Sequence, residues 1–428
     1  MKQVRPYPQV IVTRKAARSL AAGHPWVFEG EVLRTDCAPT DGRTATNGCA
    51  VDVVEENGTW QGAGLLSEQS KIRVRIVTRN ANDRLDEAFW RRRLQWSWQH
   101  RVSCMGRRTA LACGGAPDTD SCRVVFSEAD GLPGLIVDRY EQVLVTQVGT
   151  VGMELLRPVL YPLLLEVLRA DGQDVRGIYE RNDAKTRTKE GLPLYKGWWD
   201  GAEALDTHLL VHENELSFAL DLENSQKTGF FLDQKYNRRA VRDIAFGRRV
   251  LDCFCHVGPF GMNAVAGGAA FAREVDVSQT AIDLARENAR LNDMESFMGF
   301  TCANVLDYLP ELRRDRALLR SEGGPFDLIV LDPPAFTKSR GTVRSAARGY
   351  RQINCDALRL LPRGGYLATC SCSQHMTRDL LAQAIAEAAH DAGVQLKQVE
   401  ERQQAPDHPI LWGVPETHYL DFFIFQVV

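Results

Sequence analysis

Polar side chains follow three apolar runs in the second half of the chain, at the point where each run ends. Asp252 closes the run VLD, Asp276 closes EVD, and Asn304 follows FTCA. At such strand ends a first aspartate can accept a hydrogen bond from an ammonium group, a second can take both hydroxyls of a ribose, and an amide can meet an adenine edge. Gly258, in the turn after the first run, lets the backbone approach a ligand closely. The set suits a nucleoside with a charged amino-acid tail, and no G-x-G-x-x-G is present to cradle a dinucleotide.

Two further runs end in residues that suit chemistry on a flat ring. Asp332, Pro333, Pro334 and Phe336 follow the run LIVL. Because prolines fix φ and cannot continue a strand ladder, they would hold the carboxylate and the aromatic ring rigidly at a sheet edge. The next run ends in TCSCSQH, residues 369–375, and a thiol facing an aspartate at the neighbouring strand end is a candidate nucleophile. Cysteine is also a common buried small residue, and that reading stays open for a single cysteine.

The elements that position these residues alternate between strands and helices from about residue 225 onward. Strand-like runs at 249–253, 271–276, 328–331 and 366–371 are separated by helical patterns such as QTAIDLARENARL. This alternation predicts an α/β fold with a parallel, doubly wound sheet, in which ligands bind beyond the carboxyl ends of the strands. The predicted binding edge therefore coincides with the residues singled out above.

The first half of the chain has a different pattern. Five short β runs fall between residues 8 and 80, with period-2 alternation of Arg and Ile or Val in KIRVRIVTR, and they predict a small β-barrel. Residues 86–102 look helical, and residues 103–121 are rich in small residues and are the best linker candidate. Residues 122–222 read as strand, strand, helix, strand, strand, an α+β module with its helix at about 152–169.

Composition excludes several classes of protein. The 428 residues are 44% hydrophobic and 25% charged, which is ordinary for a globular chain. No apolar run approaches the roughly 20 residues that a membrane-spanning helix needs, and the N-terminus lacks a signal-peptide pattern, so we expect a cytoplasmic protein with reduced cysteines and no membrane partner. Eleven cysteines occur without any C-x-x-C. Residues 1–120 hold 18 Lys and Arg against 13 Asp and Glu in a chain of net charge −3, which fits a module that meets phosphate and also fits chance.

The motifs together resemble those of the RlmI-type ribosomal RNA large-subunit cytosine-5 methyltransferases, a class I S-adenosylmethionine-dependent family, over nearly the whole chain. HPWVFEGEV and SKIRVRIVTR resemble its RNA-binding PUA domain, and FSEADGLPGLIVDRY resembles the start of its central EEHEE domain. NSQKTGFFLDQKYNRR resembles the signature before its catalytic domain. LDPPAFTKS and TCSCSQHM resemble its fourth and sixth motifs, and DHPI with PETHYLDFFIFQV resembles its C-terminal ending.

The resemblance implies a PUA-like β domain at 1–82, a helix and linker at 83–121, a central α+β domain at 122–222, and a Rossmann-like methyltransferase domain at 223–428. It implies S-adenosylmethionine as cofactor and 23S ribosomal RNA as partner, with no metal, and it leaves a homodimer open. Within TCSCS it makes Cys372 the nucleophile and Cys370 a control. It places the cofactor on Phe231, Gln234, Asp252, Gly258, Asp276, Asn304 and Asp332.

The resemblance also suggests how the target cytosine is handled. A Cys372 thiolate would add at carbon 6 of the ring, with Asp332 hydrogen-bonded to the ring as charge builds, so that carbon 5 can accept the methyl group. The base must leave its stack, and Pro333, Pro334 and Phe336 would receive it. Lys338 and Arg340 follow in a segment suited to phosphate contact, which an ordinary solvated basic helix would also explain.

Two positions depart from the family pattern. Pro259 stands in the first motif, where the family usually has a second glycine, and proline removes an N–H donor, so we expect the cofactor loop to differ locally. Asn304 replaces a more usual aspartate.

Three rival readings remain. The fold could serve an exocyclic-amine methyltransferase in which no thiol attacks, or a non-catalytic RNA-binding or ribosome assembly factor whose cofactor site has decayed at Pro259. Cys253, Cys255, Cys370 and Cys372 could form a metal site, since two C-x-C pairs end adjacent strands.

Overall fold

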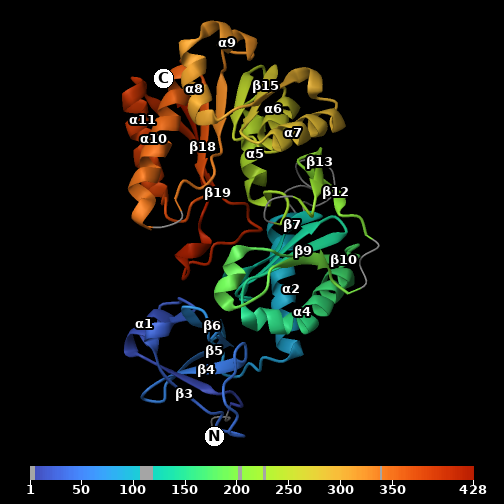
Figure 1. Ribbon diagram of the computed structural model, residues 1–428, viewed down its shortest axis with the longest axis vertical. Coiled ribbons are helices and arrows are strands. Elements are labelled where there is room, and N and C mark those ends of the chain that lie inside the picture. The colour runs from blue at the N-terminus through green and yellow to red at the C-terminus, as the bar shows by residue number, and fades with distance from the viewer. Residues whose placement is uncertain (1–4, 107–118, 201–204, 225–227, 338–339) are drawn as a thin grey trace. The chain divides into compact units, whose positions relative to one another are not determined.

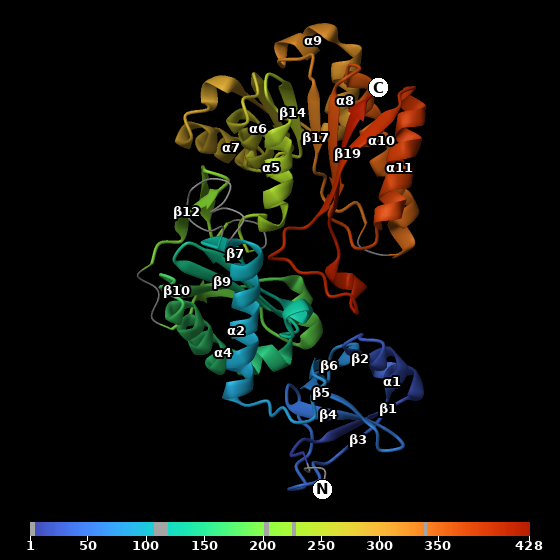
Figure 2. The same cartoon turned by 180° about the vertical axis from the view of Figure 1, so that it is seen from behind.

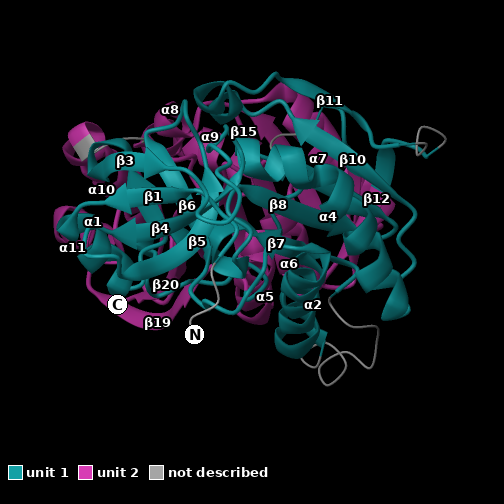
Figure 3. Ribbon diagram, turned by 90° about the horizontal axis from the view of Figure 1, so that it is seen from below, with its two compact units in different colours: residues 1–209, 220–232, 406–417 teal, residues 210–219, 233–405, 418–428 magenta. Residues whose placement is uncertain are grey.

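The computed structural model describes residues 5–106, 119–200, 205–224, 228–337 and 340–428 (Figure 1). The chain forms two compact units that are interleaved in sequence. Unit 1 comprises residues 1–209, 220–232 and 406–417, and unit 2 comprises residues 210–219, 233–405 and 418–428 (Figure 3). Lys338, one of the predicted phosphate contacts, and most of the predicted linker lie outside the described residues. No helix in the described part of the chain has the length and hydropathy needed to cross a membrane.

The N-terminal part of unit 1 is a six-stranded sheet, PUA-like as predicted. Its strands pair in the order β2-β6-β5-β4-β1-β3, and helix α1 (Arg14–Ala21) follows β1. The predicted run WVFEGEVLR forms two strands rather than one, because the 3-10 turn η1 (Glu29–Glu31) separates them. The strands are β1 (Gln9–Val12), β2 (Trp26–Phe28), β3 (Val32–Asp36), β4 (Ala50–Glu55), β5 (Trp60–Leu66) and β6 (Ile72–Thr78). Alternate residues of these strands build a valine-rich core.

The rest of unit 1 is an α+β module with one strand more before its helix than predicted. The helices α2 (Glu87–Cys104) and α4 (Val151–Ala170) form where the sequence predicts them. The sheet order is β11-β10-β9-β8-β7, in which only β9 and β10 are parallel, because α4 connects them. The strands are β7 (Ser121–Phe126), β8 (Leu135–Tyr140), β9 (Val143–Val148), β10 (Gly177–Asn182) and β11 (Tyr195–Trp198), with 3-10 turns η2 (Ser127–Asp130) and η3 (Lys185–Glu190).

A hairpin of β12 (His208–Glu213) and β13 (Leu216–Asp221) carries the chain between the units. Its two turn residues, Asn214 and Glu215, have φ values of 51° and 68°. Positive φ at both central positions matches the twist of a two-residue hairpin turn. The tip of this hairpin belongs to unit 2, and its open end belongs to unit 1.

Unit 2 is a Rossmann-like sheet covered by helices, as the sequence predicts (Figures 1 and 2). The order is β16-β15-β14-β17-β18-β20-β19, and β14 to β18 are parallel. Helices α8, α10 and α11 bury apolar side chains against the sheet, with Tyr350 and Ile385 in the same core as Leu251 and Ile329. Because β15 and β16 extend from β14 in one direction and β17 and β18 in the other, the order reverses between β14 and β17, the usual place for a ligand.

The strands of unit 2 are β14 (Arg249–Cys253), β15 (Phe271–Asp276), β16 (Met298–Cys302), β17 (Leu328–Leu331), β18 (Tyr366–Ser371), β19 (Leu396–Gln403) and β20 (Asp421–Val427). Its helices are α5 (Lys235–Asp243), α6 (Pro259–Ala266), α7 (Gln279–Leu291), α8 (Val305–Arg314), α9 (Arg316–Ser321), α10 (Val343–Leu360) and α11 (Arg378–Ala392). Short 3-10 turns are η4 (Leu232–Gln234), η5 (Glu295–Phe297) and η6 (Arg340–Thr342), and η7 (Pro415–Thr417) lies in the part of unit 1 that connects β19 to β20.

Candidate active site

The predicted polar residues gather at the carboxyl ends of the parallel strands of unit 2. Asp252 lies in β14, Asp276 ends β15, and Asn304 caps the helix that follows β16. Asp332 follows β17, and Cys370 and Cys372 lie at the end of β18. Since the ladders β15·β14, β14·β17 and β17·β18 join neighbouring strands, these side chains share one edge of the sheet.

The turn after β14 has unusual backbone geometry. Phe254 and His256 have φ values of 62° and 50°, and Gly258 has φ 84° as the residue that precedes α6. Positive φ in two large non-glycine residues is a strained arrangement of the kind that clusters at functional sites. Pro259 is the first residue of α6, a position whose N–H has no partner within a helix. The departure from the family pattern at Pro259 is therefore compatible with a well-formed turn.

Asp252 holds this turn in place. It is fully buried, and its Oδ2 accepts a hydrogen bond of 3.0 Å from the backbone N–H of Gly261 in the first turn of α6. Asp276 acts from the next strand, where its Oδ2 accepts a hydrogen bond of 3.0 Å from the backbone N–H of His256 and its Oδ1 accepts one from Ser278. The two aspartates thus fix opposite sides of the turn that Gly258 closes.

Glu274 is a buried carboxyl group that the sequence analysis did not single out. It faces Asp252 across the parallel β14·β15 ladder and is fully buried. Neither of its side-chain oxygens, nor Oδ1 of Asp252, receives a hydrogen bond from a cationic side chain of the described residues. Burial raises the pKa of Asp252 to about 7 and raises the pKa of Glu274 well above its usual range, and the charge of Asp252 adds to the shift of Glu274. The sequence carried little signal for Glu274, because the strand FAREVD also contains Arg273 and Asp276.

The edge also carries an exposed apolar side chain beside Asp276. Val277 is 72% exposed although it directly follows a strand of the core sheet. Asn304 is already engaged, because its Oδ1 accepts from the backbone N–H of Leu306 and its Nδ2 donates to Asp307. The amide of Asn304 therefore caps α8, and its predicted contact with adenine stays a proposal.

Asp332 contacts a thiol, and that thiol belongs to Cys370. The Sγ atom of Cys370 donates to Oδ1 of Asp332 at 2.9 Å, and Nε2 of Gln234 donates to the same sulfur at 3.3 Å. Burial raises the pKa of Asp332, and burial together with the charge of Asp332 raises the pKa of Cys370 well above its usual range. At neutral pH Cys370 is thus held as a neutral thiol.

Cys372 lies in a different environment two residues further along. Its side chain is half-buried, and its Sγ lies 3.7 Å from the carbonyl oxygen of Pro333, in the turn that Asp332 begins. Cys372 lies just beyond the end of β18, and the two thiols contact different partners, Asp332 and the carbonyl oxygen of Pro333. Among the described residues, no group of three or more His, Cys, Asp or Glu side chains is placed to hold a metal ion.

The residues predicted to receive the target base are only partly accessible. The ring of Phe336 packs 4.8 Å from the ring of Tyr350 in α10 and touches Gly349. Pro333 is buried and Pro334 is exposed. Arg340 begins η6, but its side chain is not among those described. The predicted roles of these residues, like that of Phe231, which belongs to unit 1, stay predictions.

The residues at this edge fit a nucleoside with a charged tail. Asp252 presents a buried oxygen without a partner, Gly258 brings the backbone close, and Asp276 and Val277 offer a carboxylate beside an apolar surface. This donor set matches the groups of S-adenosylmethionine, namely its ammonium, its ribose hydroxyls and its adenine ring.

Comparisons with known proteins agree with this interpretation. Residues 192–417 match the S-adenosylmethionine-dependent methyltransferase family, and residues 10–79 match the PUA-like domain family. A protein of Shewanella amazonensis called ribosomal RNA large subunit methyltransferase I is 38% identical over 96% of this chain and 97% of its own length. A Cronobacter sakazakii protein of the same name is 36% identical over 98% and 99%.

Solved structures show the same fold. A proposed S-adenosylmethionine-dependent methyltransferase from Streptococcus mutans is 19% identical, with a TM-score of 0.77 over 98% of this chain and 100% of that one. A second structure, of a proposed methyltransferase in complex with SAH, has a TM-score of 0.78 with the same coverage and identity. The chain therefore belongs to the ribosomal RNA large subunit methyltransferase I family, and it is an S-adenosylmethionine-dependent methyltransferase with an N-terminal PUA-like domain.

Proposed function

We propose that the protein transfers the methyl group of S-adenosylmethionine to carbon 5 of a cytosine in 23S ribosomal RNA, in the cytoplasm. The ribosomal RNA substrate follows the names of the relatives. One observation supports the choice of cytosine carbon 5. A half-buried thiol, Cys372, lies next to the turn that holds Asp332 at the neighbouring strand end.

Cys372 serves as the nucleophile in this proposal. Carbon 5 of cytosine is a poor nucleophile, so the Cys372 thiolate adds to carbon 6, and the electron pair of the ring double bond moves toward carbon 5 and the ring nitrogen. The cofactor supplies an electrophilic methyl group on its sulfonium. After carbon 5 has gained the methyl group and lost its proton to a base, the sulfur–carbon bond breaks and the thiolate is restored.

Asp332 stabilises the charge that this addition creates. Because burial raises its pKa, the carboxyl group is protonated more readily than an exposed one and can donate a hydrogen bond to the ring nitrogen. Cys370 and Gln234 lie behind it, and the Cys370 thiol donates to Asp332. Their role is to orient the carboxyl group rather than to attack the base.

The cofactor residues follow the geometry of the sheet edge. Asp252 receives the ammonium group, Asp276 the ribose and Val277 the adenine ring, while Gly258 allows the backbone to approach the tail. Gln234, Phe231 and Asn304 complete the set that the family resemblance implies. Val277 is an addition to that set, supported by its 72% exposure at the strand end.

The test compares two thiols that are two residues apart. Wild-type protein is incubated with methyl-labelled S-adenosylmethionine and unmodified ribosomal RNA, which is then digested to nucleosides. We expect the label in 5-methylcytidine. Cys372→Ala should lower its formation by about 1000-fold or more and leave SAH binding unchanged, because only the covalent step is lost. Cys370→Ala is the matched control and should retain turnover within about tenfold of the wild type.

Other outcomes would redirect the assignment. Label in a nucleoside methylated on an exocyclic amine, with Cys372→Ala still active, would keep the fold and the cofactor and remove the thiol from the mechanism. Loss of activity in Cys370→Ala alone would exchange the roles of the two thiols. RNA binding with no labelled product would favour an RNA-binding or assembly role.

A further inference from the structure

A cavity lies in unit 1, outside the methyltransferase sheet. It has a volume of about 550 Å³, within the range of ligand pockets in proteins. Five segments line it: the loop before β2, the end of β6, helix α2, the η2 turn, and the connection between β19 and β20, residues 406–417. Helix α2 lies outside both segments that match known families.

The β19–β20 connection belongs to unit 1, whose colour it has in Figure 3, and hydrogen bonds join it to helix α2 and strand β7. Arg101 of α2 donates to the carbonyl oxygen of Asp407 at 2.8 Å, and the Asp407 carboxylate accepts from the backbone N–H of Arg123 at 2.9 Å. Gly413 passes so close to Gly23 that a side chain on Gly413 would lie 2.9 Å from the Gly23 carbonyl oxygen. The walls of the cavity are therefore formed before any ligand arrives.

Two arginines of the cavity have no carboxylate partner among the described residues. Arg79 donates to the carbonyl oxygens of Leu20 and His24 at 2.6 and 3.1 Å. Arg93 donates to the carbonyl oxygen of Val77 at 2.7 Å, and its buried Nε has no partner. Burial lowers the pKa of both guanidinium groups. Most arginines of unit 1 are ion-paired, for example Arg101 with Asp130 and Arg123 with Asp138. Arg79 is exposed and Arg93 is half-buried, so both guanidinium groups can take an anion from outside.

The acidic residues of the cavity do not cancel them. Asp130 is neutralised by Arg101, whose two terminal nitrogens reach its two oxygens at 2.6 and 2.8 Å. Glu128 accepts hydrogen bonds from the indole of Trp26, at 3.0 Å, and from the hydroxyl of Ser127. The cavity thus carries two positive charges against one negative charge. Another cavity of unit 1, around Glu29, Asp36 and Glu68, lacks this excess and would repel phosphate.

Aromatic side chains complete the arrangement. Trp96 of α2 lines the cavity, is 59% exposed, and has the Arg93 guanidinium 5.4 Å from its ring centre. Trp412 follows Leu411, which also lines the cavity, and is 96% exposed. Exposed tryptophans beside unpaired arginines are the combination that proteins use to bind single-stranded nucleic acid, because every base can stack and every linkage is an anion.

We propose that this cavity binds an unpaired nucleotide of the RNA substrate, its phosphate on Arg79 and Arg93 and its base on Trp96, while Trp412 stacks on the next base. The inference rests on the proposed RNA substrate. Trp412 lies beyond the cavity wall, so a ligand that contacts both Trp412 and the cavity extends past the cavity. This favours a strand over a free nucleotide. The site anchors RNA at a point separate from the chemistry and so acts on affinity rather than on the methyl transfer itself.

The test measures binding of a fluorescein-labelled single-stranded RNA of about 12 nucleotides by anisotropy. Trp412→Ala and Trp96→Ala should each weaken binding by about five- to 100-fold, the effect of losing one base–aromatic stack. Phe246→Ala, an exposed aromatic in unit 2, is the matched control and should change the affinity less than twofold. SAH binding should be unchanged in all three variants.

Salt dependence tests the phosphate contact separately. Between about 50 and 200 mM potassium chloride, Arg93→Gln and Arg79→Gln should each lower the slope of log affinity against log salt by about 0.7, the effect of one lost phosphate contact on a single strand. Trp412→Ala should weaken binding without changing that slope. A circular dichroism spectrum checks that each arginine variant is folded.

The outcomes separate this inference from the proposed function. If both tryptophan variants bind RNA within twofold of the wild type while the wild type still methylates RNA, the cavity assignment is wrong and the function stands. If free cytidine monophosphate binds as tightly as the strand, the ligand is a small molecule and the inference is overturned. If Trp412→Ala weakens binding to purified large ribosomal subunits but not to naked RNA, the partner is a protein, which also overturns it. Weaker RNA binding by both tryptophan variants supports it even if the methylated atom is not carbon 5.

Discussion

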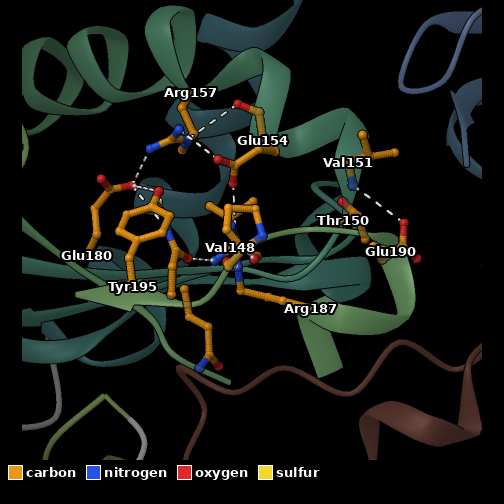
Figure 4. A network of polar contacts seen from close by, with 12 residues as sticks. Val148, Thr150, Val151, Glu154, Arg157, Glu180, Arg187, Glu190 and Tyr195 are labelled. Carbon is orange, nitrogen blue, oxygen red and sulfur yellow. Dashed lines mark hydrogen bonds and ion pairs between the residues drawn. The ribbon is translucent and has the colours of Figure 1, made fainter. Parts of the chain in front are cut away.

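Unit 1 and unit 2 treat buried carboxyl groups in opposite ways. In unit 1 (Figure 4), Oε1 of Glu180 accepts from Arg157 at 2.7 Å and from the hydroxyl groups of Tyr161 and Tyr195 at 3.1 and 3.2 Å. In unit 2, Asp252 and Glu274 face each other without a cation in hydrogen-bond contact and leave three oxygens without partners. A compensated network fixes a structure, whereas uncompensated carboxyl groups at a strand end mark a place where a charged ligand belongs.

The network of unit 1 extends to the N-terminal sheet. Arg187 is fully buried, donates to Glu154 at 3.0 Å and also to the carbonyl oxygen of Val148. Glu190, at the end of the same turn, accepts from Arg75 of β6 at 2.9 Å and from the hydroxyl of Ser67 at 2.7 Å. The PUA-like sheet is therefore joined to the central module through satisfied charges.

The largest expected effect comes from breaking the network of unit 1. Arg187→Met removes a fully buried guanidinium that contacts Glu154 and the carbonyl oxygen of Val148, and it should lower the free energy of unfolding by about 3–5 kcal/mol. Urea denaturation followed by tryptophan fluorescence measures it. Arg378→Met removes an exposed ion pair with Glu401 and should cost less than about 1 kcal/mol. Equal effects of the two variants would show that burial does not distinguish these pairs.

An intermediate loss of stability should come from a side chain added next to the carboxyl groups of Asp252 and Glu274 in unit 2. A side chain at Gly261 would lie 1.6 Å from Oε1 of Glu274, so Gly261→Ala should lower the free energy of unfolding by about 1–3 kcal/mol. Gly30→Ala is the control, since no atom lies within 4 Å of the added carbon. Adding Glu274→Ala to Gly261→Ala should recover part of the loss, and strictly additive effects would mean that the two groups do not touch.

The smallest effect depends on pH and concerns Glu274→Gln. Because the folded-state pKa of Asp252 is raised to about 7, the folded protein binds more protons than the unfolded chain between about pH 4 and pH 7. The free energy of unfolding should therefore fall as pH rises through this window. Glutamine removes a buried carboxyl group whose own pKa is raised well above its usual range by burial, so the variant should gain on the order of 1–2 kcal/mol at pH 8 and almost nothing at pH 5. Urea denaturation without cofactor at both pH values measures this, and parallel pH profiles for the two proteins would contradict it.

Much of the fold of unit 2 could be predicted because its strands are apolar runs that end in turn residues. The runs at 249–253 and 328–331 became β14 and β17, and the helical pattern QTAIDLARENARL became α7. The central module was less predictable. Its additional strand before α4 comes from splitting the run that continues from the turn at residues 130–134 into β8 and β9, and a two-residue turn leaves little signal in the sequence.

The candidate site was predictable as a set of residues but not as a set of contacts. Asp252, Asp276 and Asp332 lie at the predicted edge. The sequence did not indicate that Cys370, rather than Cys372, contacts Asp332, nor that Glu274 faces Asp252. These contacts depend on the register between strands that are far apart in the chain, and hydrophobic periodicity carries no information about register.

The sequence by itself determined the family, the cofactor and the order of the strand ends, because short motifs with fixed chemistry can be recognised without knowledge of the fold. Only the tertiary structure decided which buried carboxyl groups have a cationic partner. It gave Glu180 its arginine and left Asp252 and Glu274 without one. It also placed residues 406–417, which follow the methyltransferase sheet in sequence, in unit 1 beside Arg79 and Trp96. Ion pairs between buried groups, and cavities, form where segments that are distant in sequence pack together. Packing of this kind cannot be read from any local sequence pattern.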